Sequence, residues 1–220
     1  MKNELVVYFK PKSNISEEIR TIRTNLQFTA VRNSKVLLVT SSVPGEGKSF
    51  ISSNLACAFA QTGESTIIVD CDLRLGRTHK VFEISNNKGL SNLLSSSDLD
   101  CGAYIKRTKI DNLFVIPRGP VPPNPSELLN SINTKKLVSY LRERFDHIIF
   151  DGVPVNGLPD SLIMAGIADR VLIVSAMGYT NIDDLNETKK SLEKIDSNIA
   201  GVIVNKVKKS KMGRYSNYYE

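Results

Sequence analysis

The chain has 220 residues, of which 41% are hydrophobic and 24% are charged. This composition excludes a wholly disordered chain, and the length suits one domain with one substantial core. Apolar runs such as 36–39 and 148–150 fall far short of the roughly 20 residues that cross a bilayer, and the N-terminus lacks the pattern of a secretory signal. We therefore expect a cytoplasmic protein. Cys57, Cys71 and Cys101 lack metal-ligand spacing and are expected to be buried free thiols.

The formal net charge of +6 is concentrated at the end of the chain, where Lys206, Lys208, Lys209, Lys211 and Arg214 lie close together. Such a segment is either a solvated tail or an attraction site for acidic lipid or an acidic partner. Because the excess charge does not form a stripe across the domain, we expect no nucleic-acid partner. The predicted organisation is one domain over 1–205 and a flexible, basic, tyrosine-rich tail over 206–220.

The first predicted element is a helix over 16–28, with Ser16 as its N-cap and the carboxylates of Glu17 and Glu18 in its first turn. Short β-branched runs then predict strands over 35–40, 65–70, 112–116, 147–151, 170–175 and 200–205. Helical patterns separate them at 49–62, 134–144, 159–168 and 181–195. Continuous apolar strands are typical of sheets covered on both faces. The predicted fold class is therefore α/β, a three-layer α/β/α P-loop NTPase fold with a mainly parallel sheet.

A phosphate-binding loop is predicted between the strand at 35–40 and the following helix. Gly45 and Gly47 allow the backbone N–H groups to converge on phosphate oxygens, and the helix that begins near Lys48 adds its positive dipole end. Lys48 is expected to reach the β- and γ-phosphates and the Ser49 hydroxyl to bind Mg²⁺. The full set of expected ATP contacts in this loop is Gly45, Glu46, Gly47, Lys48, Ser49 and Phe50. The usual pattern has glycine where this chain has Ser42.

Carboxylates follow two of the predicted strands. Asp70 and Asp72 are spaced i, i+2, which predicts that they lie on the same side of an extended chain. Asp151 ends the hydrophobic strand at 147–151 in the manner of a Walker B element. Ligands of open α/β sheets collect beyond the carboxyl ends of the strands, so we expect these three side chains and the P-loop to share one crevice.

Several motifs together resemble the bacterial protein-tyrosine kinases of capsule and exopolysaccharide synthesis. The Asp70/Asp72 doublet is similar to their Walker A′ element, and 119–129 and 88–91 are similar to two further signatures. Glu17, Arg20 and Arg23 resemble their ring-assembly motif, and Tyr215, Tyr218 and Tyr219 resemble their autophosphorylated C-terminal cluster. The resemblance covers nearly the whole chain. Gly152 is a departure, because the family more often has threonine after the Walker B aspartate.

The resemblance implies an ATP- and Mg²⁺-dependent enzyme that phosphorylates tail tyrosines, mainly of neighbouring subunits. Lys48, Asp70 and Asp72 would be catalytic; Ser49, Asp72 and Asp151 would hold the metal; and Asn205 would contact adenine. Asp70 is the first choice as proton acceptor, with the roles of the three aspartates open to permutation. An aspartate is too weak a base to ionise tyrosine in advance, but phosphoryl transfer through a loose transition state makes little demand on the nucleophile.

The implied partners are a transmembrane polysaccharide co-polymerase adaptor, further copies in a ring of up to eight, and a cognate tyrosine phosphatase. The adaptor would hold the kinase at the inner face of the cell membrane. Two alternatives stay open at this point: a nucleotide-switched ATPase of the partition or cell-division type, and a pseudo-kinase scaffold. Partition-type ATPases usually carry an additional lysine where this chain has Val43, which favours the kinase. Gly152 is the only sequence feature that favours the scaffold.

Overall fold

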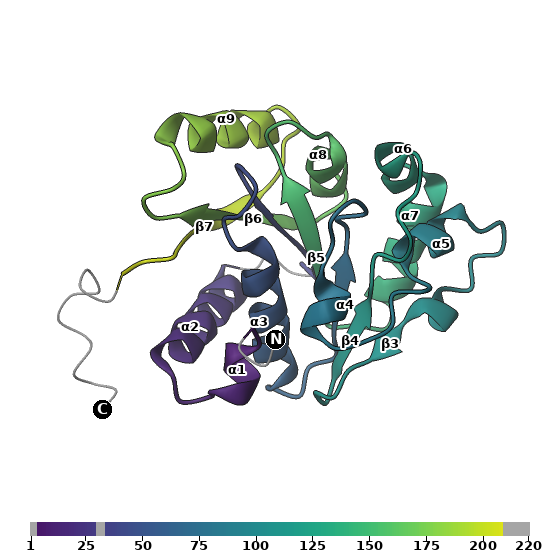
Figure 1. The fold of residues 1–220 in the computed structure, drawn as a ribbon, viewed down its shortest axis with the longest axis horizontal. Coiled ribbons are helices and arrows are strands. Elements are labelled where there is room, and N and C mark those ends of the chain that lie inside the picture. The colour runs from purple at the N-terminus through teal and green to yellow at the C-terminus, as the bar shows by residue number, and fades with distance from the viewer. Residues whose placement is uncertain (1–3, 30–33, 209–220) are drawn as a thin grey trace.

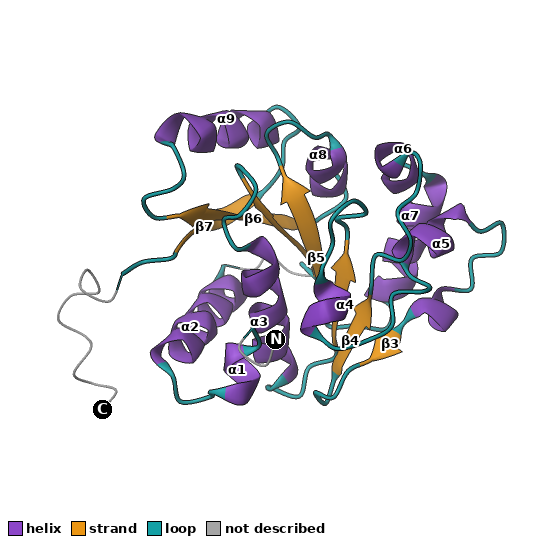
Figure 2. Ribbon diagram, in the orientation of Figure 1, coloured by secondary structure: helices purple, strands orange, loops and turns teal. Residues whose placement is uncertain are grey.

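The computed structural model describes residues 4–29 and 34–208, which form a seven-stranded sheet in the order β3-β4-β2-β5-β1-β6-β7. All pairings are parallel except that of β3 with β4. The strands are β1 (Val36–Ser41), β2 (Thr66–Asp70), β3 (Lys106–Arg107), β4 (Leu113–Ile116), β5 (His147–Pro154), β6 (Arg170–Ala176) and β7 (Ile199–Asn205). Figures 1 and 2 show the sheet running through the middle of the molecule. The predicted fold class is confirmed.

Helices cover the two faces of the sheet. They are α1 (Val6–Phe9), α2 (Asn14–Phe28), α3 (Lys48–Ala60), α4 (Thr78–Val81), α5 (Leu90–Ser95), α6 (Pro125–Leu129), α7 (Ile132–Arg142), α8 (Asp160–Ala165) and α9 (Ile182–Glu193), with a 3₁₀ turn at Cys101–Tyr104. In Figure 1, α1, α2 and α3 lie on one side of the sheet and α8 and α9 on the other. Helix α3, which carries the P-loop lysine, is almost wholly buried against the strands.

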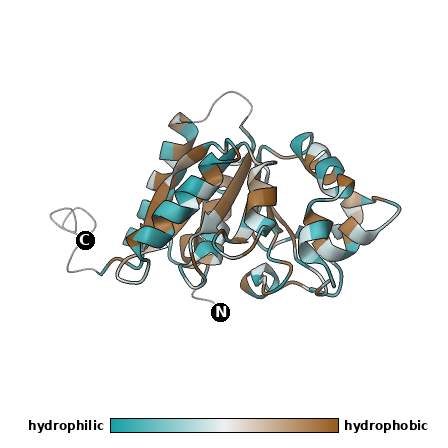
Figure 3. Cartoon of the chain, turned by 90° about the horizontal axis from the view of Figure 1, so that it is seen from above, coloured by the Kyte–Doolittle hydropathy of each residue, from teal (hydrophilic) through white to brown (hydrophobic). Residues whose placement is uncertain are grey.

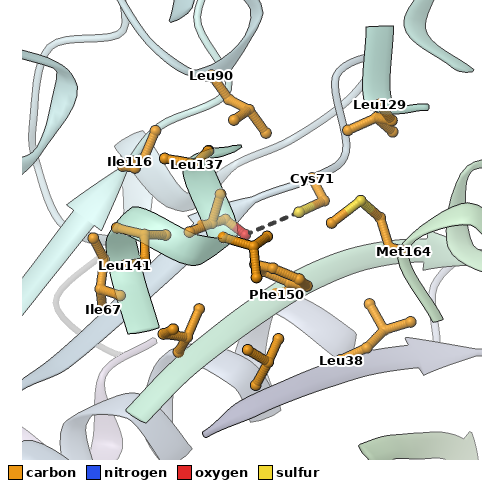
Figure 4. Close-up of a cluster of buried hydrophobic side chains, with 14 of the residues drawn as sticks. Leu38, Ile67, Cys71, Leu90, Ile116, Leu129, Leu137, Leu141, Phe150 and Met164 are labelled. Atoms are coloured by element: carbon orange, nitrogen blue, oxygen red, sulfur yellow. Dashed lines mark hydrogen bonds between the residues drawn. The ribbon is translucent and has the colours of Figure 1, made fainter. Parts of the chain in front are cut away.

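The sheet has a core on each face because neighbouring residues of a strand point in opposite directions. In β1, Leu37 and Val39 pack with α1, α2 and α3, whereas Val36 and Leu38 pack with α5, α7 and α8. The strands are accordingly the most hydrophobic part of the chain in Figure 3. Figure 4 shows the second core around Phe150, which is 1% exposed. Burying a side chain of that size stabilises the fold by roughly 1.5–3 kcal/mol.

The three cysteines are buried and free, as predicted. The Cys71 thiol donates to the Val69 carbonyl at 3.6 Å within the core of Figure 4. Burial raises the pKa of each thiol, and at Cys71 the neighbouring carboxylates raise it further. These groups are therefore packing residues.

The predicted N-cap of the first long helix is wrong. Helix α2 begins at Asn14, and its N-cap is Ser13, whose side chain accepts a hydrogen bond from the Ser16 amide at 3.3 Å. Ser16 lies inside the helix and is fully buried, and its hydroxyl donates to the Lys10 carbonyl at 2.7 Å. Ser16 thus ties the start of α2 to the segment that follows α1.

The described residues extend to Lys208, so most of the predicted tail, including Tyr215, Tyr218 and Tyr219, lies outside them. Within the described ranges, no helix has both the length and the apolar character needed to span a bilayer.

Candidate active site

The P-loop connects β1 to α3 and has the backbone conformation that a phosphate-binding loop needs. Gly45 has a φ of 83° and Gly47 a φ of 101°, both in the left-handed region that favours glycine. Gly47 is also the N-cap of α3, which starts at Lys48. The free N–H groups at this helix end and the helix dipole together favour an anion. The predicted strand–loop–helix arrangement is present.

Lys48 lies among three carboxylates at the base of the loop. Burial lowers the pKa of Lys48, and the charges of Asp151, Asp72 and Glu46 act in the opposite direction. A partly desolvated ammonium group of this kind gains more from a bound triphosphate than an exposed lysine would, since its interactions are less screened. Lys48 therefore has the environment expected of the lysine that contacts the β- and γ-phosphates.

A cavity of about 600 Å³ opens beside the P-loop. Lys48, Ser49 and Asp72 line it, together with Arg74 and Arg77 from the segment that follows β2. Apolar surface in the lining comes from Val153, Pro154 and Leu158, in and after β5. The cavity thus combines cations and hydroxyls for phosphate with apolar surface.

Asp151 is buried in β5, between β1 and β2, and does not itself line the cavity. Its Oδ1 accepts a hydrogen bond from the Ser52 hydroxyl at 3.0 Å, while its buried Oδ2 has no hydrogen-bond partner among the described residues. Burial raises the pKa of Asp151, against the hydroxyls of Ser49 and Ser52 and the charge of Lys48, which lower it. A buried carboxylate oxygen without a partner is a group that a cation would satisfy.

The predicted metal ligands Ser49, Asp72 and Asp151 are therefore a chemically suitable set for Mg²⁺. They are all oxygen donors, and Mg²⁺ in nucleotide sites is usually held by one or two carboxylates together with phosphate oxygens and water. Ser49 and Asp72 line the cavity, and Asp151, whose charge acts on Lys48, has a buried oxygen without a partner among the described residues. The residues fit the ion that the fold family implies.

Asp70 is fully buried and does not line the cavity. Its Oδ2 accepts hydrogen bonds from the Thr78 amide at 3.0 Å and the Thr78 hydroxyl at 2.7 Å, at the start of α4. Its Oδ1 has no partner among the described residues and faces Gly76, where an added Cβ would lie only 2.2 Å away. Burial and the neighbouring charge of Asp151 raise the pKa of Asp70 well above its usual range.

Asp72 is the carboxylate of the doublet that reaches the cavity. Strand β2 ends at Asp70, and the chain then turns, with Asp72 Oδ1 accepting from the Arg74 amide at 3.1 Å and the Leu75 amide at 2.8 Å. The predicted i, i+2 arrangement on one side of an extended strand is therefore wrong. The turn sends Asp70 into the interior and Asp72 to the phosphate side.

Two arginines of the site had no role in the sequence analysis. Arg74 lies against a buried carboxylate, with its Nε 3.3 Å from Asp160 Oδ2 at the start of α8, and its guanidinium also contacts the Ser126 hydroxyl. Arg77 pairs with Glu4 at 3.2 Å on the rim. The sequence could have indicated both arginines, because they follow Asp72 within five residues and a positive charge there can face the same phosphates.

A second cavity, of about 710 Å³, lies on the other side of Gly47 and Phe50, between α2 and β7. Its walls are largely apolar, and Asn205 lies at the end of β7 on its border. Phe50 and Gly47 line both cavities. The predicted phosphate ligands thus lie on one side of the loop and Asn205 on the other, and their contacts with ATP stay predictions.

The predicted oligomerisation residues lie on α2, where they make contacts within the chain. Arg20 pairs with Glu17 and donates to the Pro11 carbonyl at 2.8 Å. Arg23 Nη1 donates to the Ala58 carbonyl of α3 at 2.8 Å. These contacts hold α2 on the domain and leave the ring assembly a prediction.

Comparison with known proteins places this chain in a family. The CobQ/CobB/MinD/ParA nucleotide binding domain matches residues 37–219. The putative tyrosine-protein kinase CapB of Staphylococcus aureus is 37% identical over 98% of this chain and 94% of its own length. The tyrosine-protein kinase YwqD of Bacillus subtilis is also 37% identical, over 99% of the chain and 92% of its own length. The chain belongs to this family of tyrosine-protein kinases.

Solved structures agree with this assignment. The kinase domain of the Escherichia coli tyrosine kinase ETK superposes on this kinase with a TM-score of 0.90 at 31% identity, over 96% of this chain and 83% of that one. The cell division ATPase MinD of Pyrococcus furiosus has a TM-score of 0.66 at 22% identity, over 78% and 71%, and shares the fold alone. The family, the P-loop fold and the enzyme class predicted from the sequence are therefore confirmed for this kinase.

The departure at Gly152 has a structural counterpart. Gly152 is buried in β5, and a Cβ added there would lie 3.0 Å from Ser161 Oγ, 2.8 Å from Leu38 Cδ1 and 3.1 Å from the Val39 carbonyl oxygen. The Ser161 hydroxyl, from α8, donates to the Val153 carbonyl and lies 3.2 Å from Thr40 Oγ1. A neighbouring hydroxyl therefore occupies the space that a larger residue at position 152 would need.

Proposed function

We propose that this kinase transfers the γ-phosphoryl group of ATP to Tyr215, Tyr218 and Tyr219, mainly on a neighbouring copy, and thereby regulates capsular or exopolysaccharide synthesis. The observation that carries the proposal is the cavity beside the P-loop, whose lining combines Lys48, Ser49 and Asp72 with apolar residues in and after β5. The polar residues suit the triphosphate and its metal, and the apolar residues suit the ring of an incoming tyrosine.

In the reaction, the tyrosine oxygen forms a bond to the γ-phosphorus while the bond from that phosphorus to the bridging oxygen of ADP breaks. Lys48 and the P-loop amides stabilise the charge on the transferring group and on the departing ADP. Mg²⁺ held by Ser49, Asp72 and Asp151 would neutralise further charge on the β- and γ-phosphates. Because Lys48 and the P-loop amides belong to the folded chain, they should require little reorganisation during the transfer.

The phenolic proton passes to a carboxylate late in the transfer. The sequence prediction assigns this role to Asp70, but Asp72 lines the cavity and Asp70 is covered by the turn at Gly76. In the described conformation Asp72, which we also propose as a metal ligand, is the carboxylate of the doublet within reach of the cavity, and Asp70 would accept the proton only if residues 73–77 moved. Replacing each aspartate by asparagine separates the two roles, because the proton acceptor should lose turnover more than nucleotide affinity.

The activity is tested by incubating the full chain with Mg·ATP and mapping phosphotyrosine by mass spectrometry. Lys48→Met should abolish labelling, whereas Lys136→Met, on an exposed part of α7, should not change it. Replacing the three tail tyrosines by phenylalanine should remove the label and leave ATP binding intact. ATP hydrolysis with no phosphotyrosine on the tail or on an added substrate would instead support a nucleotide-switched ATPase.

Phosphorylation in trans is tested with two variants in one tube. The Lys48→Met chain supplies intact tail tyrosines, and the tail-phenylalanine chain supplies an active site. Label on the Lys48→Met tail requires transfer between copies. Two results together would show transfer within one chain. The Lys48→Met tail would carry no label in the mixture, and the labelling rate per molecule of the parent would not change on dilution.

The proposed partners are a transmembrane polysaccharide co-polymerase adaptor, which activates the kinase and holds it at the inner face of the membrane, and a cognate tyrosine phosphatase. We also propose a ring of up to eight copies assembled through Glu17, Arg20 and Arg23. Adding the cytoplasmic segment of the adaptor should increase the labelling rate. Replacing Glu17 and Arg20 by alanine should reduce the particle mass measured by light scattering.

A further inference from the structure

Three consecutive carbonyl groups of the P-loop accept hydrogen bonds from side chains outside the loop. The bonds run from Tyr179 Oη to the Pro44 carbonyl at 3.1 Å, from Lys206 Nζ to the Gly45 carbonyl at 2.7 Å, and from Asn205 Nδ2 to the Glu46 carbonyl at 2.8 Å. Tyr179 comes from the loop between β6 and α9, and the other two residues lie at and just after the end of β7. We call this set of donors the carbonyl clamp.

The clamp has a direct consequence for the amides of the loop. A trans peptide unit is planar, with its C=O and N–H groups pointing in opposite directions. Fixing the carbonyls of Pro44, Gly45 and Glu46 outward therefore fixes the N–H groups of Gly45, Glu46 and Gly47 toward the opposite side of the loop. Those amides are the ones that a P-loop presents to phosphate oxygens.

The members of the clamp also pack on the loop and on one another. Lys206 Nζ lies 5.2 Å from the centre of the Tyr179 ring, within the range of a cation–π contact. An added Cβ on Gly45 would touch the Tyr179 hydroxyl at 3.5 Å, and one on Gly47 would collide with Asn205 Nδ2 at 2.2 Å. The two glycines thus permit both the left-handed backbone and the close approach of the clamp.

A further bond ties the same loop to the segment that carries Tyr179. Glu46 is fully buried; its carboxylate accepts from the Val43 amide at 2.8 Å and from the Thr180 hydroxyl. Thr180 Oγ1 in turn accepts from the Ala176 amide at the end of β6 at 2.8 Å. The loop that presents Tyr179 is therefore held beside the P-loop by a buried carboxylate, which gives the exposed tyrosine a defined position.

We propose that Tyr179 and Lys206 are positioning residues of the kinase, which hold the P-loop amides in their phosphate-binding arrangement before the nucleotide arrives. The inference rests on the proposed function only in that the loop binds the phosphates of ATP. Neither side chain is required to touch the substrate. Binding then loses less conformational entropy, because the loop does not have to be ordered at that moment.

The test uses two variants of the full chain. Tyr179→Phe keeps the ring and removes the hydroxyl, and Lys206→Met keeps an unbranched side chain of similar length and removes the charge. Controls are Tyr8→Phe on α1 and Lys208→Met, an exposed lysine two residues beyond the clamp. Affinities for Mg·ATP and for Mg·tripolyphosphate are measured by titration calorimetry. We expect each clamp variant to bind both ligands about fivefold more weakly, the factor that one lost hydrogen bond gives, and each control to bind as the parent does.

Tripolyphosphate separates positioning of the loop from contact with the base. Loss of ATP affinity with unchanged tripolyphosphate affinity would mean that the two side chains recognise adenine, and would overturn the proposal. Equal affinities of variant and parent for both ligands would overturn it as well. So would a loss accompanied by an equal fall in the free energy of unfolding without ligand, since that would show a general structural role.

Failure of the carbonyl clamp can be distinguished from failure of the proposed kinase function. A parent chain that binds Mg·ATP but labels no tyrosine refutes the proposed function and leaves the clamp to be decided by the affinities. Clamp variants that bind like an active parent refute the clamp alone. A parent that binds neither ligand refutes both.

Discussion

Replacing Asp70 by asparagine should stabilise the folded chain at neutral pH. Asp70 is fully buried, and its Oδ1 has no partner among the described residues. A Cβ added to Gly76 would lie 2.2 Å from Asp70 Oδ1 and 2.5 Å from the Asp72 carbonyl oxygen, so these two hydrogen-bond acceptors lie close to each other. An asparagine amide can donate there, while its oxygen keeps the bonds from Thr78. On folding at neutral pH this carboxyl must either take up a proton or bury its charge, and asparagine avoids both costs, so the substitution is expected to raise the free energy of unfolding by about 2 kcal/mol.

The gain should depend on pH. Burial raises the pKa of Asp70, so the folded chain holds this proton more tightly than the unfolded chain, whose carboxyl titrates near pH 4. The free energy of unfolding therefore falls as pH rises from about 4 through the raised folded pKa, and levels off above it. Asp70→Asn removes its share of this fall. Asp151, whose pKa is also raised, leaves a remaining slope in the variant.

Urea unfolding of parent and variant at pH 5, 6.5 and 8 measures both effects. The difference in the free energy of unfolding should favour the variant and grow with pH. Asp146→Asn is the matched control, and its effect on the free energy of unfolding should be opposite to that of Asp70→Asn. Hydrogen bonds from Ser65 lower the pKa of Asp146. Its loss should therefore destabilise the chain at neutral pH. A variant at position 70 that is less stable than the parent at pH 8 would show that the Asp70 carboxylate is satisfied by a contact that stabilises the fold, and would refute the reasoning.

Three further substitutions follow from the packing. Gly152→Thr should lower the free energy of unfolding by roughly 1–3 kcal/mol, because the side chain would press on β1 and α8; a thermal melt that is unchanged would contradict the packing. Arg23→Ala should cost about 1 kcal/mol by removing the bond to the Ala58 carbonyl, whereas a smaller particle of unchanged stability would mean that Arg23 acts only in assembly. Asp160→Asn should lower kcat more than it raises KM, because it frees Arg74 beside the phosphates; a pure KM effect would place Arg74 in ground-state binding.

The fold could be predicted because its main signals are local. The strands that became β1, β2 and β5 are continuous apolar runs, and the glycines and lysine that separate β1 from α3 have a mechanism that fixes both their spacing and their conformation. Short elements were missed for the opposite reason. Helix α1 is held by the bond from the Val7 amide to Asn54 Oδ1 at 3.0 Å, a contact between residues 47 apart that no local pattern contains.

The candidate site was predicted in its composition but only partly in its geometry. Lys48, Ser49 and Asp72 line one cavity, as expected from strand ends that share an edge of the sheet. The period-two rule failed at Asp72 because β2 ends at Asp70, so the rule was applied two residues beyond the end of the strand. Where a strand stops depends on the turn that follows, and here the Asp72 carboxylate itself caps that turn.

The carbonyl clamp is a part of the site that the P-loop sequence motif does not include. A P-loop pattern describes the residues whose amides face the phosphate, but the orientation of those amides is also set by whatever binds the carbonyls on the other side of the same peptide planes. In this kinase the donor for Pro44 is 135 residues away and the donor for Gly45 is 161 residues away. Chains with the same loop sequence can therefore differ in phosphate affinity through distant donors.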